Sequence, residues 1–132
     1  MKQQRKLGSD GPLVSAIGYG AMGLEGYYGK SEDDDAVKVI QHALDAGCFF
    51  IDTADAYGNG HNEQLISRAL ANRRNDAFIA TKFGIVFDPD EEGTQVPTGW
   101  GFSLKINGKP EYVQHALDSS LKRLGTTHID LW

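Results

Sequence analysis

The sequence predicts an α/β fold in which a β-hairpin is followed by four parallel strands that alternate with three helices. Three observations support this class. Short apolar runs of strand length alternate with longer segments whose apolar residues recur at helical spacing. Glycine or proline stands where the helical segments should begin or end. Such alternation implies right-handed crossovers between parallel strands, and one core for a chain of 132 residues.

The first 20 residues are expected to form the hairpin and the first parallel strand. Residues 4–7 and 13–16 flank Gly8-Ser9-Asp10-Gly11, and a Gly/Asp turn between two short strands is typical of a β-hairpin. The first parallel strand should then cover residues 16–20.

Residues 18–23 read Gly-Tyr-Gly-Ala-Met-Gly and fit the dinucleotide-binding pattern G-x-G-x-x-G. That fingerprint requires a helix that starts inside the motif, so that the helix N-terminus meets the pyrophosphate. The glycines at positions 26 and 29 are poor helix residues, and the first good helix start comes only at Ser31. We therefore disfavour a Rossmann dehydrogenase and interpret the run as a strand end followed by a flexible loop.

Ser31 is a suitable N-cap for the first helix, and the acidic residues 32–35 suit the positive end of the helix dipole. We interpret this acidic run as a helix start rather than a metal site, because a hard cation needs convergent ligands from a fixed loop. Gly47 is a natural helix stop, and the second parallel strand should cover residues 48–53.

Two further helices are predicted on the same grounds. The second should begin at Asn62 and end near residues 73–75, because its apolar residues follow helical spacing. Pro110 in the first turn and Gly125 just past the end bracket the third. The strands that follow them should cover residues 77–81 and 128–132.

Residues 83–109 form the longest stretch in which we expect no regular structure. Loops of this length are either functional or disordered. One interpretation is a disordered surface insertion, and the other is a substrate-facing loop with Trp100 and Phe102 as apolar contacts. The spacing of residues does not decide between them.

The strongest functional signal lies in residues 49–63, which read FFIDTADAYGNGHNE. A buried strand ends in Asp52, Tyr57 lies on the loop beyond it, and Asn62-Glu63 begins a helix. With His61 between the turn and Asn62, the pattern resembles the aldo-keto reductase signature, D-x-A-x-x-Y-G-N-E or close to it. Two further segments match in family order, together with a short run near the end: Ala80-Thr81-Lys82-Phe83, Ser119-Ser120-Leu121-Lys122-Arg123-Leu124-Gly125 and Ile129-Asp130-Leu131.

The resemblance implies that residues 1–132 are a truncated aldo-keto reductase domain. The fold would be the N-terminal half of a (β/α)8 TIM barrel, with the N-terminal hairpin across its bottom and the barrel not closed. A complete barrel of this kind needs roughly 250 residues. The polypeptide is then a fragment or a half-barrel that must find a partner. We expect self-association through the open barrel edge, because unpaired strands and apolar helix faces would be exposed.

The resemblance also implies NADPH-dependent reduction of a small carbonyl substrate, an aldehyde or a ketone, to an alcohol. Tyr57 would be the general acid, with Lys82 and Asp52 as the other catalytic residues. A free phenol has a pKa of about 10 and donates its proton poorly near neutrality, whereas a nearby cation favours the phenolate. Lys82 would supply that cation, and Asp52 would be its counter-ion. The alternative for these residues is a packing tyrosine beside an ordinary surface ion pair.

For the cofactor, the resemblance implies that Gly20, Ala21 and Met22 line the floor of the nicotinamide pocket and that Asp52 contributes to binding. The family's catalytic histidine follows the fourth strand, beyond the matching segment at residues 129–131, and most remaining cofactor groups lie in the second half of the barrel. We therefore expect weak activity or none from this polypeptide alone. The alternative is a non-catalytic binding or assembly module, since the same fold serves as a regulatory subunit of potassium channels.

Composition narrows the classes of partner. A net charge of −5 argues against nucleic acid and anionic membranes, and no apolar run is long enough to span a bilayer. The basic start, MKQQRKLG, has no apolar stretch behind it, so we expect no secretory signal. Cys48 is the single cysteine, which excludes an internal disulfide and fits a cytoplasmic protein. One cysteine and four scattered histidines give no metal-ligand spacing, so no metal is expected.

Overall fold

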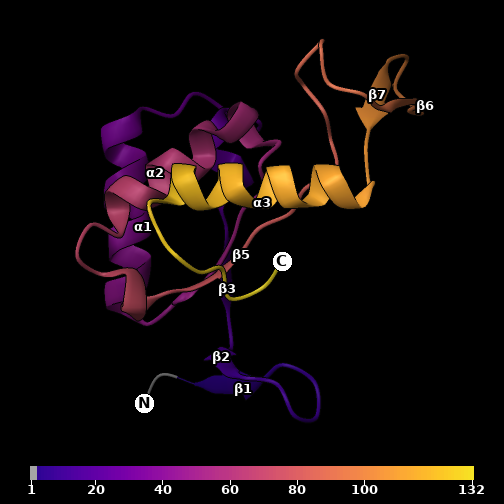
Figure 1. Ribbon diagram of the computed structural model, residues 1–132. Coiled ribbons are helices and arrows are strands. Elements are labelled where there is room, and N and C mark those ends of the chain that lie inside the picture. Colours follow the sequence, from indigo (N-terminus) through magenta and orange to yellow (C-terminus); the bar gives the residue numbers. More distant parts are fainter. Residues whose placement is uncertain (1–2) are drawn as a thin grey trace.

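The computed structural model describes residues 3–132, so Met1 and Lys2 of the basic N-terminal segment lie outside the described residues. The elements follow the expected order along the chain (Figure 1). The strands are β1 (Gln4–Lys6), β2 (Leu13–Ser15), β3 (Gly18–Gly20), β4 (Phe50–Asp52), β5 (Phe78–Ala80), β6 (Thr94–Pro97) and β7 (Ser103–Ile106). The α-helices are α1 (Asp33–Ala46), α2 (His61–Ala69) and α3 (Pro110–Leu124), and the 3-10 turns are η1 (Ala21–Glu25), η2 (Tyr57–Gly60) and η3 (Arg74–Asp76).

The central sheet is parallel and has the strand order β3-β4-β5, which confirms the predicted α/β class. Its register sets Gly20, Asp52 and Ala80 side by side at the carboxyl ends of the three strands. The predicted fourth strand at residues 128–132 lies beside β5, at the expected edge of the sheet. It forms only one parallel bridge within the described residues, between Ala80 and Leu131. The barrel is not closed, as expected.

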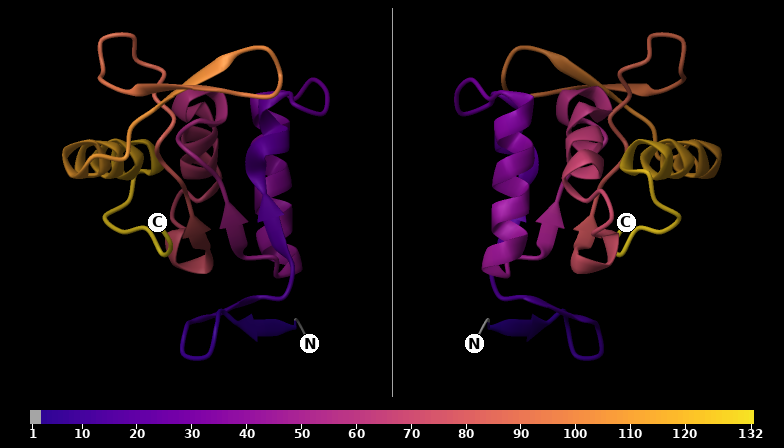
Figure 2. Two further views of the ribbon diagram at one scale, coloured as in Figure 1. Left: turned by 90° about the vertical axis from the view of Figure 1, so that its right-hand side faces the viewer. Right: turned by 90° about the vertical axis from the view of Figure 1, so that its left-hand side faces the viewer.

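The two hairpins lie at opposite ends of the molecule (Figures 1 and 2). The predicted N-terminal hairpin is formed by the antiparallel pair β1–β2. The arrows of the parallel strands point away from this pair and toward the β6–β7 hairpin (Figure 2). The carboxyl ends of the strands, where the functional residues are expected, therefore face the end of the molecule that carries β6–β7.

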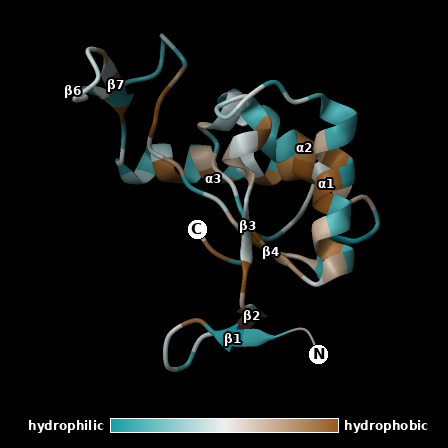
Figure 3. Cartoon of the chain, turned by 180° about the vertical axis from the view of Figure 1, so that it is seen from behind, coloured by the Kyte–Doolittle hydropathy of each residue, from teal (hydrophilic) through white to brown (hydrophobic). Residues whose placement is uncertain are grey.

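The core lies between the sheet and the helices. Ile51 and Ile79 project from the middle of β4 and β5 and are fully buried against Ile40 of α1 and Ile66 of α2. The apolar residues of α1 and α2 gather where these two helices meet (Figure 3). Because side chains alternate along a strand, Phe50 and Asp52 of β4 project from the face of the sheet opposite Ile51. No helix within residues 3–132 is long and apolar enough to cross a membrane.

Glycine and proline predicted the helix ends correctly, whereas the polar residue predicted as an N-cap is not at that position. Gly47 and Gly125 close α1 and α3 in left-handed conformations, with φ of 85° and 63°, and Pro110 begins α3 as predicted. Ser31 is not the N-cap of α1, because the cap position is occupied by Glu32 and no side chain bonds the free N–H groups.

The predicted second helix was too long at its C-terminal end and began one residue late. It starts at His61 and stops at Ala69, not near residues 73–75. Arg74 instead donates hydrogen bonds to the carbonyl oxygens of Ala77 and His128 and to the Asp130 carboxylate. These bonds draw the segment away from the helix and tie it to the C-terminal residues.

The prediction of an irregular stretch at residues 83–109 was wrong in its centre. Strands β6 and β7 form an antiparallel hairpin there, in which Thr94 pairs with Ile106 and Pro97 with Ser103. The Lys105 ammonium group donates to three backbone carbonyl oxygens of the preceding loop, at residues 88, 89 and 91. At residues 18–29 the 3-10 turn η1 follows β3, so the α-helix that a dinucleotide-binding fingerprint would require does not form there, in agreement with our rejection of that fingerprint.

Candidate active site

Two of the three predicted catalytic residues meet at the tips of β4 and β5. Asp52 is the last residue of β4, and Lys82 lies two residues beyond the end of β5. The Lys82 Nζ donates to Asp52 Oδ1 at 2.8 Å and to the Thr53 carbonyl oxygen at 2.5 Å. The side chains of Lys82 and Asp52 are 49% and 46% exposed, so this ion pair faces solvent.

Tyr57 completes the group that the sequence predicted. Its ring centroid lies 4.9 Å from Lys82 Nζ, which places the ammonium group over the ring. The Tyr57 ring also contacts Tyr27 edge-to-face, with 6.4 Å between the centroids. The three side chains therefore come together at one end of the sheet, from two strand tips and the loop between β4 and α2.

The Gly58-Asn59-Gly60 turn holds Tyr57 in this place. All three residues have positive φ, and Asn59, with φ of 51°, is one of two non-glycine residues with this conformation within residues 3–132. A side chain at Gly58 would collide with the Glu25 carboxylate, and one at Gly60 would collide with Arg123. A substitution at either glycine would shift the Glu25 or Arg123 side chain, and the left-handed backbone conformation of both positions favours glycine.

The second and third residues of α2 are polar and buried, which is unusual for a helix start. Asn62 and Glu63 have no exposed surface. Asn62 bonds to Thr53 and to η1, and Glu63 bonds to Thr81 and to Arg123 of α3. The family-matching segments of the sequence contain Asn62, Glu63, Thr53, Thr81 and Arg123, but no role was predicted for any of them. The one signal that could have found them is a polar pair inside an otherwise apolar helix stripe.

The residues expected to line a nicotinamide pocket differ in accessibility. Gly20 is exposed beside Asp52, and a Cβ built on it would meet no atom within 4 Å, so the surface there is open. Met22 is half-buried. Ala21 is fully buried, and its carbonyl oxygen accepts a hydrogen bond from Asn62 at 2.9 Å. Ala21 therefore lies beneath this surface and not on it.

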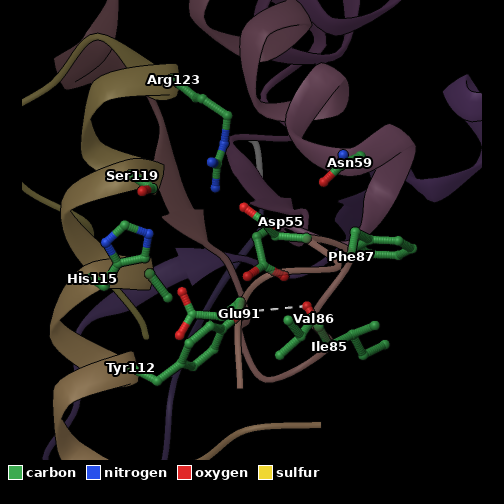
Figure 4. Close-up of a pocket in the computed structure, with 12 residues that line it drawn as sticks. Asp55, Asn59, Ile85, Val86, Phe87, Glu91, Tyr112, His115, Ser119 and Arg123 are labelled. Atoms are coloured by element: carbon green, nitrogen blue, oxygen red, sulfur yellow. Dashed lines mark hydrogen bonds between the residues drawn. The ribbon is translucent and has the colours of Figure 1, made fainter. Parts of the chain in front are cut away.

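A separate pocket of about 140 Å³ opens between α3, the loop after β4 and the loop after β5 (Figure 4). Asp55, Tyr112 and Arg123 line it, whereas Asp52, Tyr57 and Lys82 do not. Arg123 reaches from α3 toward Asp55 in this view. Burial, and then the charge of Glu63, raise the pKa of the Asp55 carboxyl to about 6. No motif or spacing in the sequence indicated this pocket.

None of the four histidines joins the predicted catalytic group in the described residues. His61 Nδ1 lies 3.1 Å from the Glu25 carboxylate and Nε2 lies 3.3 Å from Asp33, so its ring faces η1 and α1. The hydrogen bond with Glu25 raises the pKa of His61. His115 lines the pocket of Figure 4, and His128 lies near Asp130. Within residues 3–132 no three His, Cys, Asp or Glu side chains gather as a metal site.

Comparisons with known proteins agree with the resemblance that the motifs indicate. The family model described as "Aldo/keto reductase family" matches residues 16–132. Aldo-keto reductase yakc of Schizosaccharomyces pombe, whose name specifies NADP(+), is 45% identical over 97% of this chain and 35% of its own length. "Probable aldo-keto reductase 1" of Glycine max is 41% identical over 98% of this chain and 35% of its own length. The chain thus spans about a third of the length of these curated relatives.

A solved structure agrees in fold as well. The holo form of the aldo-keto reductase AKR11C1 from Bacillus halodurans superposes with a TM-score of 0.79 at 31% identity. The match covers 98% of this chain and 38% of that one. The parallel sheet and its helices therefore correspond to one part of a larger barrel.

Proposed function

Because this chain belongs to the aldo/keto reductase family, we propose that residues 1–132 are the N-terminal part of an NADP(H)-dependent oxidoreductase. The reaction is the reduction of an aldehyde or ketone to an alcohol. The observation that carries this proposal is the meeting of Tyr57, Lys82 and Asp52 at the carboxyl ends of parallel strands, with 2.8 Å between Lys82 Nζ and Asp52 Oδ1. Active sites of (β/α)8 enzymes lie at this end of the barrel.

Each of the three side chains has a distinct role in the proton transfer. Tyr57 gives its phenolic proton to the carbonyl oxygen of the substrate, which becomes the hydroxyl oxygen of the product. The Lys82 ammonium group, 4.9 Å from the ring centroid, stabilises the phenolate that remains. Asp52 balances the charge of Lys82 and holds its Nζ in place. The reduced nicotinamide cofactor, when bound, supplies the hydride that adds to the carbonyl carbon.

The chain's own residues fit one end of such a cofactor. Gly20 leaves the surface beside Asp52 open, so a flat ring can approach the backbone there. Asp52 Oδ1 is bonded to Lys82, and Oδ2 has no partner among the described residues, so it can accept a hydrogen bond from a ligand. We assign cofactor contacts to Gly20, Met22 and Asp52, and to Ala21 only a supporting place below them. The name of the S. pombe relative supports NADPH as the reductant.

Replacement of Tyr57 by Phe in a form that carries the complete barrel tests the assignment. We expect kcat for a small aldehyde to fall by about 100-fold or more, because general acid catalysis contributes that much, while the Kd for NADPH stays within about twofold. Tyr28→Phe is the matched control, since Tyr28 is a loop tyrosine that is 81% exposed. Equal turnover by Tyr57→Phe and the wild type would exclude Tyr57 as the proton donor.

The 132-residue polypeptide by itself should show weak turnover or none. It lacks the histidine that the resemblance places after residue 131 and the second half of the cofactor site. Steady-state assays with NADPH and a small aldehyde test this expectation, and a measurable kcat would contradict it. We also expect self-association of this polypeptide, because the outer edge of β3 is unpaired and Leu131 makes the only bridge to the outer edge of β5 within residues 3–132. A folded monomer in sedimentation velocity would contradict that expectation.

A further inference from the structure

We infer that Asn62 and Glu63 are positioning residues: together they form a buried clamp that fixes the tips of β4 and β5, so that Lys82 meets Asp52 and Tyr57. The clamp is defined as the side chains of Asn62 and Glu63 and the hydroxyl groups of Thr53 and Thr81 that they bind. The inference rests on the proposed function for its chemical purpose. Its geometry stands on buried contacts that do not depend on turnover.

The first arm of the clamp joins β4 to η1. Asn62 has no exposed surface, and its Oδ1 accepts a hydrogen bond of 2.7 Å from the Thr53 hydroxyl. Its Nδ2 donates to the Ala21 carbonyl oxygen at 2.9 Å and to Glu25 Oε1 at 3.0 Å. One amide thus holds a strand tip and η1 together. Tyr27 lies two residues after η1 and contacts the Tyr57 ring, so this arm also helps to position the phenol.

The second arm joins β5 to α3. Glu63 has no exposed surface, and its Oε1 accepts a hydrogen bond of 2.8 Å from the Thr81 hydroxyl. Its Oε2 accepts from Arg123 Nε at 2.6 Å, and Arg123 Nη2 donates in turn to the fully buried Ser120 hydroxyl. Both carboxylate oxygens therefore have partners, which a buried carboxylate requires.

Both arms end next to the predicted catalytic residues. Thr53 follows Asp52, and its carbonyl oxygen accepts a hydrogen bond from Lys82 Nζ. Thr81 precedes Lys82 in the chain. The Lys82–Asp52 pair is half exposed, and exposed ion pairs alone hold long side chains weakly. The position of the ammonium group therefore depends also on the backbone at the two strand tips, including the Thr53 carbonyl oxygen, and the two arms hold that backbone.

A local role in α2 does not explain these side chains. Asn62 and Glu63 stand in the first turn of α2, where polar residues commonly cap free backbone N–H groups. The helix has no side-chain cap at its N-terminus, and the bonds of both residues go to other elements instead. Their burial thus serves contacts between elements and not the helix end.

Amine labelling of Lys82 tests the clamp without any measurement of activity. We would expose the intact chain to a trace of an acetylating reagent and follow each lysine by mass spectrometry. In Thr53→Val and Thr81→Val, loss of one buried hydrogen bond should let Lys82 react roughly fivefold to tenfold faster. Lys38 on α1, which is 72% exposed, is the internal reference and should keep its rate.

Two sets of variants separate positioning from loss of stability. Thr53→Ser and Thr81→Ser keep the hydroxyl groups and should return Lys82 labelling to within about twofold of the wild type. Asp130→Asn weakens a different bond to β5, the one from Ile79 N–H, and should lower Tm without faster labelling of Lys82. If a valine variant does not fold, Glu63→Gln replaces it, because its amide would face Arg123 and loosen the second arm.

The outcomes are decisive in both directions. Folded valine variants that label Lys82 at the wild-type rate overturn the inference. Asp130→Asn overturns it as well if it accelerates Lys82 labelling as much as the valine variants at an equal loss of Tm. Faster labelling that serine reverses supports the clamp even if Tyr57→Phe shows the proposed reduction to be wrong, so the two proposals fail separately.

Discussion

Two ion pairs stand at the same end of the sheet and differ in their surroundings. Lys82 and Asp52 are 2.8 Å apart with side chains 49% and 46% exposed. Arg123 and Glu63 are 2.6 Å apart with side chains 24% and 0% exposed. Their distances are nearly equal, so distance alone does not distinguish their roles. What differs is whether water, or a ligand, can reach the charges.

The difference in exposure indicates that the two ion pairs have different roles. An exposed pair contributes at most about 1 kcal/mol to folding, because water screens it and its side chains lose entropy. Removal of one partner from a buried pair leaves a charge without its partner and costs about 3–5 kcal/mol. The accessible pair can take part in chemistry with a bound substrate, and the buried pair can hold the strand tips in place. Four predictions test this distinction between exposed and buried pairs.

The largest effect should come from Glu63→Ala. The substitution leaves Arg123 and the Thr81 hydroxyl without their buried partner, so the free energy of unfolding should fall by about 3 kcal/mol or more. Urea unfolding at neutral pH measures it. Gln64→Ala is the control, because Gln64 is the exposed neighbour on α2 and should change stability by less than about 0.5 kcal/mol. Similar losses in both variants would remove the distinction between the pairs.

The next effect concerns Asp55, a carboxyl that forms no ion pair with another side chain among residues 3–132. Burial raises its folded-state pKa to about 6 from an ordinary value of 3.8, so the folded state binds the proton more tightly than the unfolded state. Stability from this group is complete below about pH 4 and is lost as the pH rises through 6. Asp55→Asn should therefore stabilise the fold at pH 7.5, on the order of 1 kcal/mol after allowance for solvent screening, and not at pH 4.

Urea unfolding at both pH values tests the Asp55 prediction. Asp88→Asn is the matched control, because Asp88 lines the same pocket but is exposed. Stabilisation by Asp55→Asn that is equal at pH 4 and pH 7.5 would show that the carboxyl charge is not the cause.

A smaller stability effect is expected at the exposed pair. Lys82→Met should change the free energy of unfolding by less than about 1 kcal/mol, because the ammonium group is half exposed. In a form with the complete barrel, the same variant should lose reductase activity while it stays folded. A loss of stability as large as that of Glu63→Ala would mean that Lys82 serves the fold first.

Much of the fold could be predicted from the sequence, because local signals and tertiary contacts agree there. Gly47, Pro110 and Gly125 mark helix ends through backbone constraints that no distant contact alters. The ends that were missed depend on such contacts. The C-terminal end of α2 is set by bonds from Arg74 to residues more than 50 positions away. The β6–β7 hairpin is held by Lys105, whose bonds to three carbonyl oxygens leave no periodic pattern.

The candidate site was predictable only where it resembles a family. Asp52, Tyr57 and Lys82 follow from motif order and from the rule that parallel strand tips meet at one edge. Thr53, Thr81 and Arg123 stand in the matching segments too, but their buried contacts could not be predicted. One hydroxyl after an acid, or one arginine in a helix, has many ordinary explanations. The sequence also could not show that Ala21 is buried beneath the surface that Gly20 leaves open. Burial depends on packing across the whole core.

The smallest expected effect lies at a third pair, which is intermediate in exposure between the first two. The side chains of His61 and Glu25 are 40% and 9% exposed, with His61 Nδ1 3.1 Å from Glu25 Oε2. The bond to Glu25 raises the pKa of His61, so its stabilising contribution is complete below about pH 6.5 and is lost as the pH rises through the raised pKa. Glu25→Gln should lower that pKa, as NMR titration of the imidazole C–H signals can show.

The effect of Glu25→Gln on stability should be only a few tenths of a kcal/mol below pH 6.5, because the imidazole is well solvated. Asp33→Asn is the control, since Asp33 contacts the other ring nitrogen at 3.3 Å and is itself 52% exposed, so it should shift the pKa less. An equal shift in both variants would show that burial of one partner does not set the strength of these pairs. Because Glu25 Oε1 also accepts a hydrogen bond from Asn62, an effect of Glu25→Gln on Lys82 labelling would extend the clamp to η1.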